Sequence, residues 1–214
     1  MHVFINAAMS ADGRISNRHR AQIEISDEED FERVDQLRAE SDAIMVGVGT
    51  VLADDPSLTV KSQERREKHG NPIRVIADSR ARTPGNAEVL RGEGEVIIAV
   101  GNQAPEENRK DISDEATLFE TPARRVDLGG VLEYLSDRGV EKLMVEGGSE
   151  LNYSLIRNGL VDTLMVYMGP LIIGGRDSPG LVGGEGFIDD YPELELESAD
   201  TIGSGIVVEW SFVG

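Results

Sequence analysis

Short apolar runs, separated by polar stretches with helical patterns, predict a largely parallel sheet covered by helices. Continuous apolar runs of this kind are typical of strands that are buried on both faces of a sheet. The strands expected from these runs are His2–Ala8, Ala43–Val48, Ile73–Ala77, Val96–Val100, Ala116–Phe119, Leu143–Val145 and Thr163–Met168. Because helical patterns alternate with them, the sequence indicates βαβ units and an α/β fold.

Capping residues mark the starts of two of these helices. Ser26 is expected to cap the first helix, with Glu29 completing a capping box, and Phe31, Val34, Leu37 and Arg38 follow at helical spacing. Asp127 is expected to cap a second helix that runs through Arg138.

The C-terminal third of the chain has a different pattern. Leu194–Ala199 and Gly205–Phe212 alternate apolar with polar residues and have no helix between them, which predicts antiparallel strands at the sheet edge. Glu64–Gly70 and Gly101–Asp114 are polar and are expected to be surface loops, and Gly180–Gly186 is expected to be a mobile, glycine-rich one.

Composition narrows the class of protein. The 214 residues contain no linker, so we expect a single domain over residues 1–214. No apolar run approaches the ~20 residues of a membrane span, and the first residues enter a strand pattern without a signal peptide. A cytoplasmic protein is therefore expected. With no cysteine, a disulfide framework, a thiolate nucleophile and Cys-ligated zinc are excluded, and no metal site is expected.

The charge balance is strongly acidic. Forty acidic residues face 21 basic ones, giving a net charge of −19, and lysine is scarce. Such a surface repels nucleic acid and anionic membranes, so neither is expected as a partner. The acid excess favours adaptation to a high-salt cytoplasm over an ordinary acidic protein.

The segment KLMVEGGSEL at residues 142–151 is the first candidate for chemistry. An apolar strand leads into Glu146, then Gly147 and Gly148, and then the start of a helix. Glycines permit close approach of a ligand to the backbone, and a helix N-terminus suits a phosphate. Glu146 is expected to face the reacting part of a ligand. The alternative is a tight strand-to-helix connection without a ligand.

Two further strand ends carry polar residues. In Met45–Lys61, a glycine-bearing turn follows a strand, where Thr50 can donate to a phosphate or ribose hydroxyl and Asp54 can accept from ribose or a carboxamide. The alternative for both is turn and cap chemistry.

In Arg74–Arg82, Ser79, Arg80 and Arg82 follow a strand, as a 2′-phosphate of NADP requires, although a solvated loop gives the same pattern.

Several sequence blocks together resemble one family. These are Asn6 with MSADG at residues 9–13, LRAESDAIMVGVGTVLADDPSLTV, the stretch from Asn71 to Ser79, VEGGSEL, and the Gly174–Gly175 loop, in this order. Over essentially the whole chain they are similar to the reductases of riboflavin biosynthesis, both the archaeal and fungal stand-alone type and the reductase half of the bacterial bifunctional enzyme. The resemblance implies a dihydrofolate-reductase-like fold, a homodimer, and NADPH as cofactor, with NADH as the alternative.

The resemblance also implies site residues. The cofactor contacts fall on Thr50, Asp54, Ser79, Arg80, Ala81, Arg82, Val126, Gly148, Ser149, Glu150 and Leu151. The substrate contacts fall on Asn6, Arg38, Leu58, Lys61 and Glu146. Position 61 is Arg in many bacterial members, so Lys61 keeps the charge but not the bidentate fork. Ser149 stands where a small residue is often found.

The implied reaction is reduction of a ribosylamino-pyrimidinone 5′-phosphate to the ribitylamino compound, by hydride transfer to ribose C1′ as an imine. The chain lacks the cysteines of the bacterial deaminase domain, which favours the still-aminated 2,5-diamino substrate. Glu146 and Asp54 are the catalytic candidates. Two alternatives remain: another NADPH reductase of this fold acting on a pterin or other heterocycle, and a non-catalytic nucleotide-binding module.

Overall fold

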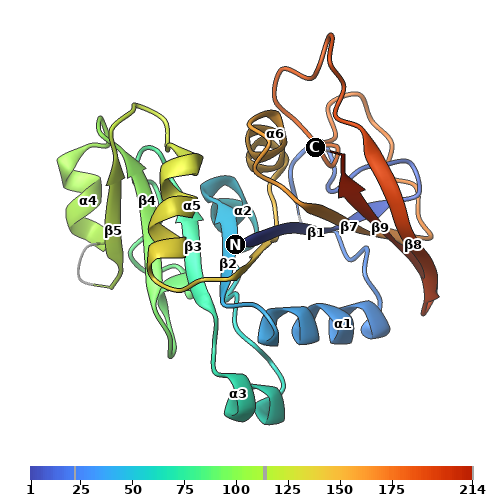
Figure 1. Cartoon of the computed structure of the whole chain (residues 1–214), viewed down its shortest axis with the longest axis horizontal. Helices are drawn as coiled ribbons and strands as arrows, with labels where there is room; N and C mark the ends of the chain where they lie inside the picture. Colours follow the sequence, from blue (N-terminus) through green and yellow to red (C-terminus); the bar gives the residue numbers. More distant parts are fainter. Residues whose placement is uncertain (22, 113–114, 214) are drawn as a thin grey trace. The chain divides into compact units, whose positions relative to one another are not determined.

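The computed structural model describes residues 1–21, 23–112 and 115–213, which form two compact units (Figure 1). Unit 1 contains Met1 and Asp35–Met144, and unit 2 contains His2–Val34 and the chain from Val145 onward. The expectation of one domain over 1–214 stays a prediction. No helix in the described part of the chain is long and apolar enough to cross a membrane.

Unit 1 is built on a parallel sheet with the strand order β5-β4-β3-β2-β6. The strands are β2 (Ala43–Gly47), β3 (Ile73–Ala77), β4 (Val96–Gly101), β5 (Thr117–Thr121) and β6 (Lys142–Val145). The pairs β2–β3, β3–β4 and β4–β5 are parallel. Residues of β2, β3 and β4 are almost all buried, as their apolar runs predict.

Helices connect the strands of this sheet along the chain. They are α2 (Val48–Asp54), α3 (Gln63–His69), the short 3₁₀ helix η1 (Glu88–Leu90), α4 (Glu106–Ile112) and α5 (Leu128–Asp137), while α1 (Glu28–Ala39) ends in unit 1. Helix α5 packs on β5, where the rings of Tyr134 and Phe119 stack with centroids 4.2 Å apart. Asp127 caps α5 by accepting from the Gly130 N–H, as predicted.

Unit 2 contains the strands β1 (His2–Ser10), β7 (Thr163–Gly169), β8 (Leu194–Ile202) and β9 (Gly205–Phe212), and the helix α6 (Ser149–Arg157). Strand β1 pairs with β7 in parallel, and β9 pairs with β7 and β8 antiparallel. The antiparallel C-terminal strands are therefore confirmed. Figure 1 shows β8 and β9 as the orange and red arrows.

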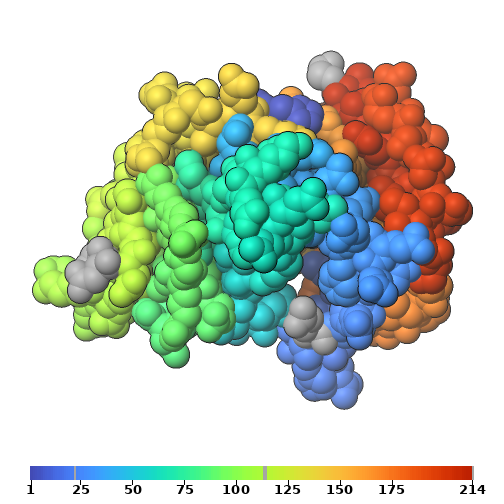
Figure 2. All heavy atoms as spheres, turned by 90° about the horizontal axis from the view of Figure 1, so that it is seen from below, coloured from blue at the N-terminus to red at the C-terminus, as the bar shows by residue number. Residues whose placement is uncertain are grey.

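Two segments predicted as loops are helices. Glu64–Gly70 falls on α3, which begins where the Ser62 hydroxyl accepts from the Arg65 N–H. None of the α3 residues is buried, and the teal residues of α3 lie on the surface in Figure 2. Gly101–Asp114 contains α4, and its last two residues lie outside the described part of the chain. Without an apolar face, neither helix has the periodicity that predicts one.

The predicted cap of the first helix is also wrong by one residue. The carboxylate of Asp27 accepts from the Asp30 N–H at 3.0 Å, so Asp27 caps α1. The Ser26 hydroxyl donates instead to the Asp30 carboxylate. Glu29 accepts from the Gly203 N–H at 3.1 Å and does not close a capping box.

Candidate functional site

The turn predicted after β2 is a helix, and it carries two of the candidates. Helix α2 begins after Gly47, which has extended backbone and offers no side-chain cap, so Thr50 lies within its first turn and Asp54 ends it. Asp54 is half-buried, and burial raises the pKa of its carboxyl from the usual 3.8. A carboxyl with a raised pKa can exchange a proton nearer to neutral pH.

The loop that follows β3 is organised by a fully buried aspartate. The Asp78 carboxylate accepts from the Thr83 N–H at 2.7 Å and from the Thr83 hydroxyl at 2.9 Å. Ala81 adopts a left-handed backbone with φ of 51° inside this turn. In this turn Arg80 and Arg82 are exposed, while Ala81 between them is buried.

Ser79 and Val126 are 47 residues apart in sequence, and the structure brings them together. The Ser79 hydroxyl accepts from the Val126 N–H at 3.0 Å. Val126 immediately precedes Asp127, the cap of α5, whose own N–H donates to Thr121 at the end of β5. Two predicted cofactor contacts thus share one hydrogen bond at the strand ends of unit 1.

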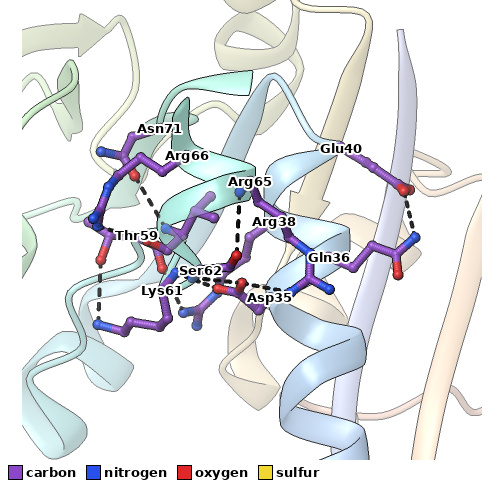
Figure 3. A network of polar contacts seen from close by, with 11 residues as sticks. Asp35, Gln36, Arg38, Glu40, Thr59, Lys61, Ser62, Arg65, Arg66 and Asn71 are labelled. Atoms are coloured by element: carbon purple, nitrogen blue, oxygen red, sulfur yellow. Dashed lines mark hydrogen bonds and ion pairs between the residues drawn. The ribbon is translucent and has the colours of Figure 1, made fainter. Parts of the chain in front are cut away.

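The predicted substrate cations meet at one loop, residues 57–62 (Figure 3). Arg38, on α1, donates to the Thr59 carbonyl at 3.2 Å. The Lys61 ammonium donates to the Ser57 hydroxyl at 2.7 Å and to the Thr59 hydroxyl at 3.4 Å. The loop therefore gathers two positive charges and two hydroxyl groups, which is a donor set suited to a phosphate.

Leu58 anchors this loop. Its exposed fraction is 1%, and its backbone is left-handed with φ of 51°, a strained conformation for leucine that the buried side chain holds in place. Its predicted contact with a substrate stays a prediction.

Three residues of this loop region are missing from the sequence-based candidates. Asp35 accepts from the N–H groups of the loop, and Ser57 and Thr59 supply its hydroxyls. One available signal is that Asp35 lies three residues before Arg38 and so shares its helix face. Ser57 and Thr59 flank Leu58, whose left-handed backbone has no signal in the sequence, and their hydroxyls lie 3.1 Å apart.

In unit 2, the two glycines before α6 adopt backbone conformations that residues other than glycine rarely take. Gly147 and Gly148 have φ of 100° and 26°, and α6 begins without a side-chain cap. The predicted contacts Ser149, Glu150 and Leu151 form its first turn. A helix N-terminus without a side-chain cap suits an anionic group.

The glycine-rich loop predicted to be mobile is tied to α6. The Gly183 N–H donates to the Ser149 carbonyl at 3.0 Å, and the Gly184 N–H donates to the Glu150 carboxylate at 3.1 Å. The Asn152 side chain donates to the Leu181 carbonyl at 2.9 Å. Residues 181–184 are therefore held against the helix that carries the cofactor candidates.

The remaining candidates in unit 2 are Asn6 and Glu146. Asn6 lies in β1, is 6% exposed, and its Oδ1 has no hydrogen-bond partner among the described residues. A buried acceptor without a partner is costly, which points to a ligand donor. Glu146 follows β6 and is half-buried. The described residues contain no group of three or more His, Asp or Glu arranged to hold a metal ion.

The parallel sheet of unit 1, joined by helices and followed at its strand ends by cations and hydroxyls, defines an α/β protein. The model of the family described as the RibD C-terminal domain matches residues 1–208. The chain belongs to this family, as the sequence blocks predict.

Two relatives match over their full length and carry the same name, 2,5-diamino-6-ribosylamino-4(3H)-pyrimidinone 5′-phosphate reductase. The protein from Archaeoglobus fulgidus is 48% identical, covering 99% of this chain and 98% of its own. The protein from Methanothermobacter thermautotrophicus is 46% identical, covering 100% of this chain and 99% of its own.

Solved structures confirm the predicted fold. A pyrimidine reductase-like protein from Corynebacterium diphtheriae has a TM-score of 0.87 at 18% identity, covering 100% of this chain and 92% of that one. Dihydrofolate reductase from Enterococcus faecalis has a TM-score of 0.52 at 12% identity, covering 99% and 96%. The fold is therefore the expected dihydrofolate-reductase-like one.

The raised pKa of Asp54 predicts a gain in stability when its charge is removed. Because the native state holds this proton more tightly than the unfolded state, stability falls as pH rises through the range above 3.8. Asp54→Asn should therefore raise the Tm at pH 7 by about 1–3 °C, and the gain should shrink toward pH 3. Differential scanning calorimetry across this pH range measures it.

The adjacent Asp55 is the matched control. Its carboxylate accepts from the Glu88 N–H at 2.8 Å, so Asp55→Asn should not stabilise the protein. A Tm gain for both variants, or a loss for Asp54→Asn at pH 7, contradicts the burial argument.

Proposed function

We propose that this protein reduces 2,5-diamino-6-ribosylamino-4(3H)-pyrimidinone 5′-phosphate to the ribitylamino product, with NADPH as the reductant. The observation that carries the proposal is full-length identity of 46–48% to two reductases named for this substrate. The loop of residues 57–62, with Arg38 and Lys61, supports it independently, because a 5′-phosphate needs such a donor set.

The residues present fit a nicotinamide cofactor with an extra phosphate. The exposed guanidinium groups of Arg80 and Arg82 stand on a turn fixed by Asp78, as 2′-phosphate recognition requires. In unit 2, the positive end of the α6 dipole, which follows Gly147 and Gly148, suits the diphosphate. We therefore assign cofactor binding to Thr50, Asp54, Ser79, Arg80, Ala81, Arg82, Val126, Gly148, Ser149, Glu150 and Leu151.

The protein's own residues bind and polarise the substrate, and NADPH supplies a hydride when bound. Arg38 and Lys61 neutralise the 5′-phosphate, Leu58 shapes the loop between them, and the free acceptor of Asn6 takes an amine or hydroxyl donor of the substrate. Glu146 holds the pyrimidine amines and stabilises the positive charge on the imine at C1′. Asp54, with its raised pKa, assists proton exchange.

The acidic composition supports a halophilic, archaeal origin for the chain, with a net charge of −19 that high salt screens.

Because high salt screens this charge, enzyme activity should be measured at multimolar KCl. Purified protein should oxidise NADPH on addition of the diamino ribosylamino phosphate, followed by the loss of nicotinamide absorbance. Dihydrofolate should give no oxidation. Turnover with the pterin alone supports another reductase of this fold, and cofactor binding without any turnover supports a binding module.

Glu146 is the sharpest test of the assigned residues. Glu146→Gln should lower kcat by about 10²–10⁴-fold, the contribution typical of a positioned charged or proton-transferring group. The Kd for NADPH, measured by fluorescence titration, should stay within about twofold because Glu146 is assigned to the substrate. The control is Glu141→Gln. Glu141 is exposed and precedes β6, whereas Glu146 follows it, so this variant should keep full turnover. Unchanged kcat in Glu146→Gln removes the catalytic assignment.

We also propose that the protein is a homodimer. Leu194 and Leu196 on β8 pair with Phe212 and Trp210 on β9, so the four side chains share one face of the hairpin. Leu196 is 53% exposed, and β8 is paired on one side only, which supports an intermolecular contact there.

Light scattering at multimolar KCl should give twice the chain mass of 23.3 kDa. Leu196→Glu should yield a monomer, since it places a charge in the apolar face. Ile172→Glu, at an exposed residue of the same unit outside this face, should remain dimeric. A monomeric wild type refutes the proposal.

A further inference from the structure

The carboxylate of Asp35 is directed at the backbone of the loop of residues 57–62 (Figure 3). It accepts from the N–H of Lys61 through one oxygen and from the N–H of Ser62 at 3.0 Å through the other. Its second oxygen also accepts from the Arg65 guanidinium at 3.1 Å. Asp35 is 7% exposed, so these contacts are sheltered from water.

Asp35 and Arg38 together form a two-point clamp on this loop. They lie three residues apart on α1 and so project from the same helix face. Asp35 accepts from the N–H of Lys61, and Arg38 donates to the carbonyl of Thr59 at 3.2 Å. With the backbone fixed on both sides of residue 60, the Lys61 ammonium reaches the Ser57 hydroxyl at 2.7 Å.

A carboxylate beside a phosphate site is repulsive unless its charge is offset. Burial opposes the ionised form of Asp35, but hydrogen bonds from Lys61, Ser62 and Arg65 outweigh it and lower the pKa below 3.8. The side chains of Arg65 and Asp35 form an ion pair in which both are mostly buried, at 24% and 9% exposed. Arg65 therefore balances the negative charge of Asp35, so that the carboxylate repels an anion at the loop less strongly.

We propose that Asp35 is a positioning residue for the substrate phosphate, which fixes the loop that carries Lys61, and that Arg65 is its charge partner. The proposal rests on the function proposed above, in which Arg38 and Lys61 bind the 5′-phosphate. Asp35 itself touches neither substrate nor cofactor in this assignment. Its effect is on the geometry of the donor set, and so on binding more than on the chemical step.

Asp35→Asn keeps the shape of the side chain but removes its charge and one acceptor oxygen. The KM for the phosphorylated substrate should rise by about tenfold to a hundredfold, the range for loss of charge-assisted hydrogen bonds. At saturating substrate, kcat should stay within about threefold, and the Kd for NADPH should not change. With the dephosphorylated substrate, wild type and variant should have the same KM, because no phosphate is left to position.

Asp30→Asn is the matched control. Asp30 lies on the same helix and is fully buried, but its side chain pairs with Arg33 at 2.8 Å and with the Ser26 hydroxyl rather than with residues 57–62. It should lower the Tm without altering the KM for the phosphorylated substrate. Equal KM effects in Asp30→Asn and Asp35→Asn would assign Asp35 a merely structural role and overturn the proposal.

Arg65→Gln gives a second variant that leaves the bonds from Asp35 to the backbone intact. It should raise the KM for the phosphorylated substrate, because the carboxylate then repels the phosphate, and the rise should be larger at the lowest KCl concentration that supports activity than at multimolar KCl. An unchanged KM in both Asp35→Asn and Arg65→Gln overturns the proposal, as does a rise that is equal for the dephosphorylated substrate.

Failure of the proposed function is recognised separately, because wild type then oxidises no NADPH with this substrate. In that case inorganic phosphate is titrated calorimetrically against wild type and Asp35→Asn. Weaker binding in the variant supports the positioning role, and equal binding or no binding to wild type overturns it.

Discussion

Aspartate carboxylates that accept hydrogen bonds from backbone N–H groups fix the loops of both units. A loop that leaves a strand has N–H groups without sheet partners, and an aspartate can satisfy two of them at once. Several aspartates do this, each with its partner far along the chain or across a turn, so the hydrogen bond sets the path of the loop. Examples are Asp12 with residues 173 and 174, Asp27 with Ser204, Asp35 with Lys61 and Ser62, and Asp78 with Thr83.

This use of aspartate also explains how so acidic a chain keeps defined loops. Hydrogen bonds to the ionised form lower the pKa of Asp12 to about 2, and those of Asp27 and Asp35 also fall below 3.8, so these groups stay charged. In molar salt the Debye length is about 3 Å. Exposed ion pairs such as Lys110–Glu106 lose strength there, whereas short charge-assisted bonds to the backbone keep theirs.

The strands and the fold follow from the sequence because their signal is local. Apolar runs such as Val96–Val100 must be buried, and burial on both faces implies a parallel, covered sheet. Helices α3 and α4 give no such signal, since they bury little or nothing and are held by polar contacts. In α2, Gly47 and Gly49 suggest a turn, but in the structure Gly47 only precedes the helix and Gly49 continues it.

The residues of the candidate site also differ in whether a local sequence pattern locates them. Residues at strand ends, such as Ser79 and Glu146, can be located from the strand pattern, and the family resemblance adds Arg38 and Lys61. For Asp35 the sequence offers only its shared helix face with Arg38, because its role depends on backbone N–H groups 26 and 27 residues away. Pairings at that distance depend on tertiary structure and have no local pattern.

The departure at position 61 is consistent with this organisation. An arginine binds a phosphate through a planar fork that supplies both charge and direction, whereas a lysine supplies a point charge on a flexible stem. Here the ammonium of Lys61 is held by the hydroxyls of Ser57 and Thr59, which are 3.1 Å apart. The hydroxyls can supply the direction that the ammonium lacks. Lysine can replace the fork only if the loop backbone is fixed, and the clamp of Asp35 and Arg38 meets that condition.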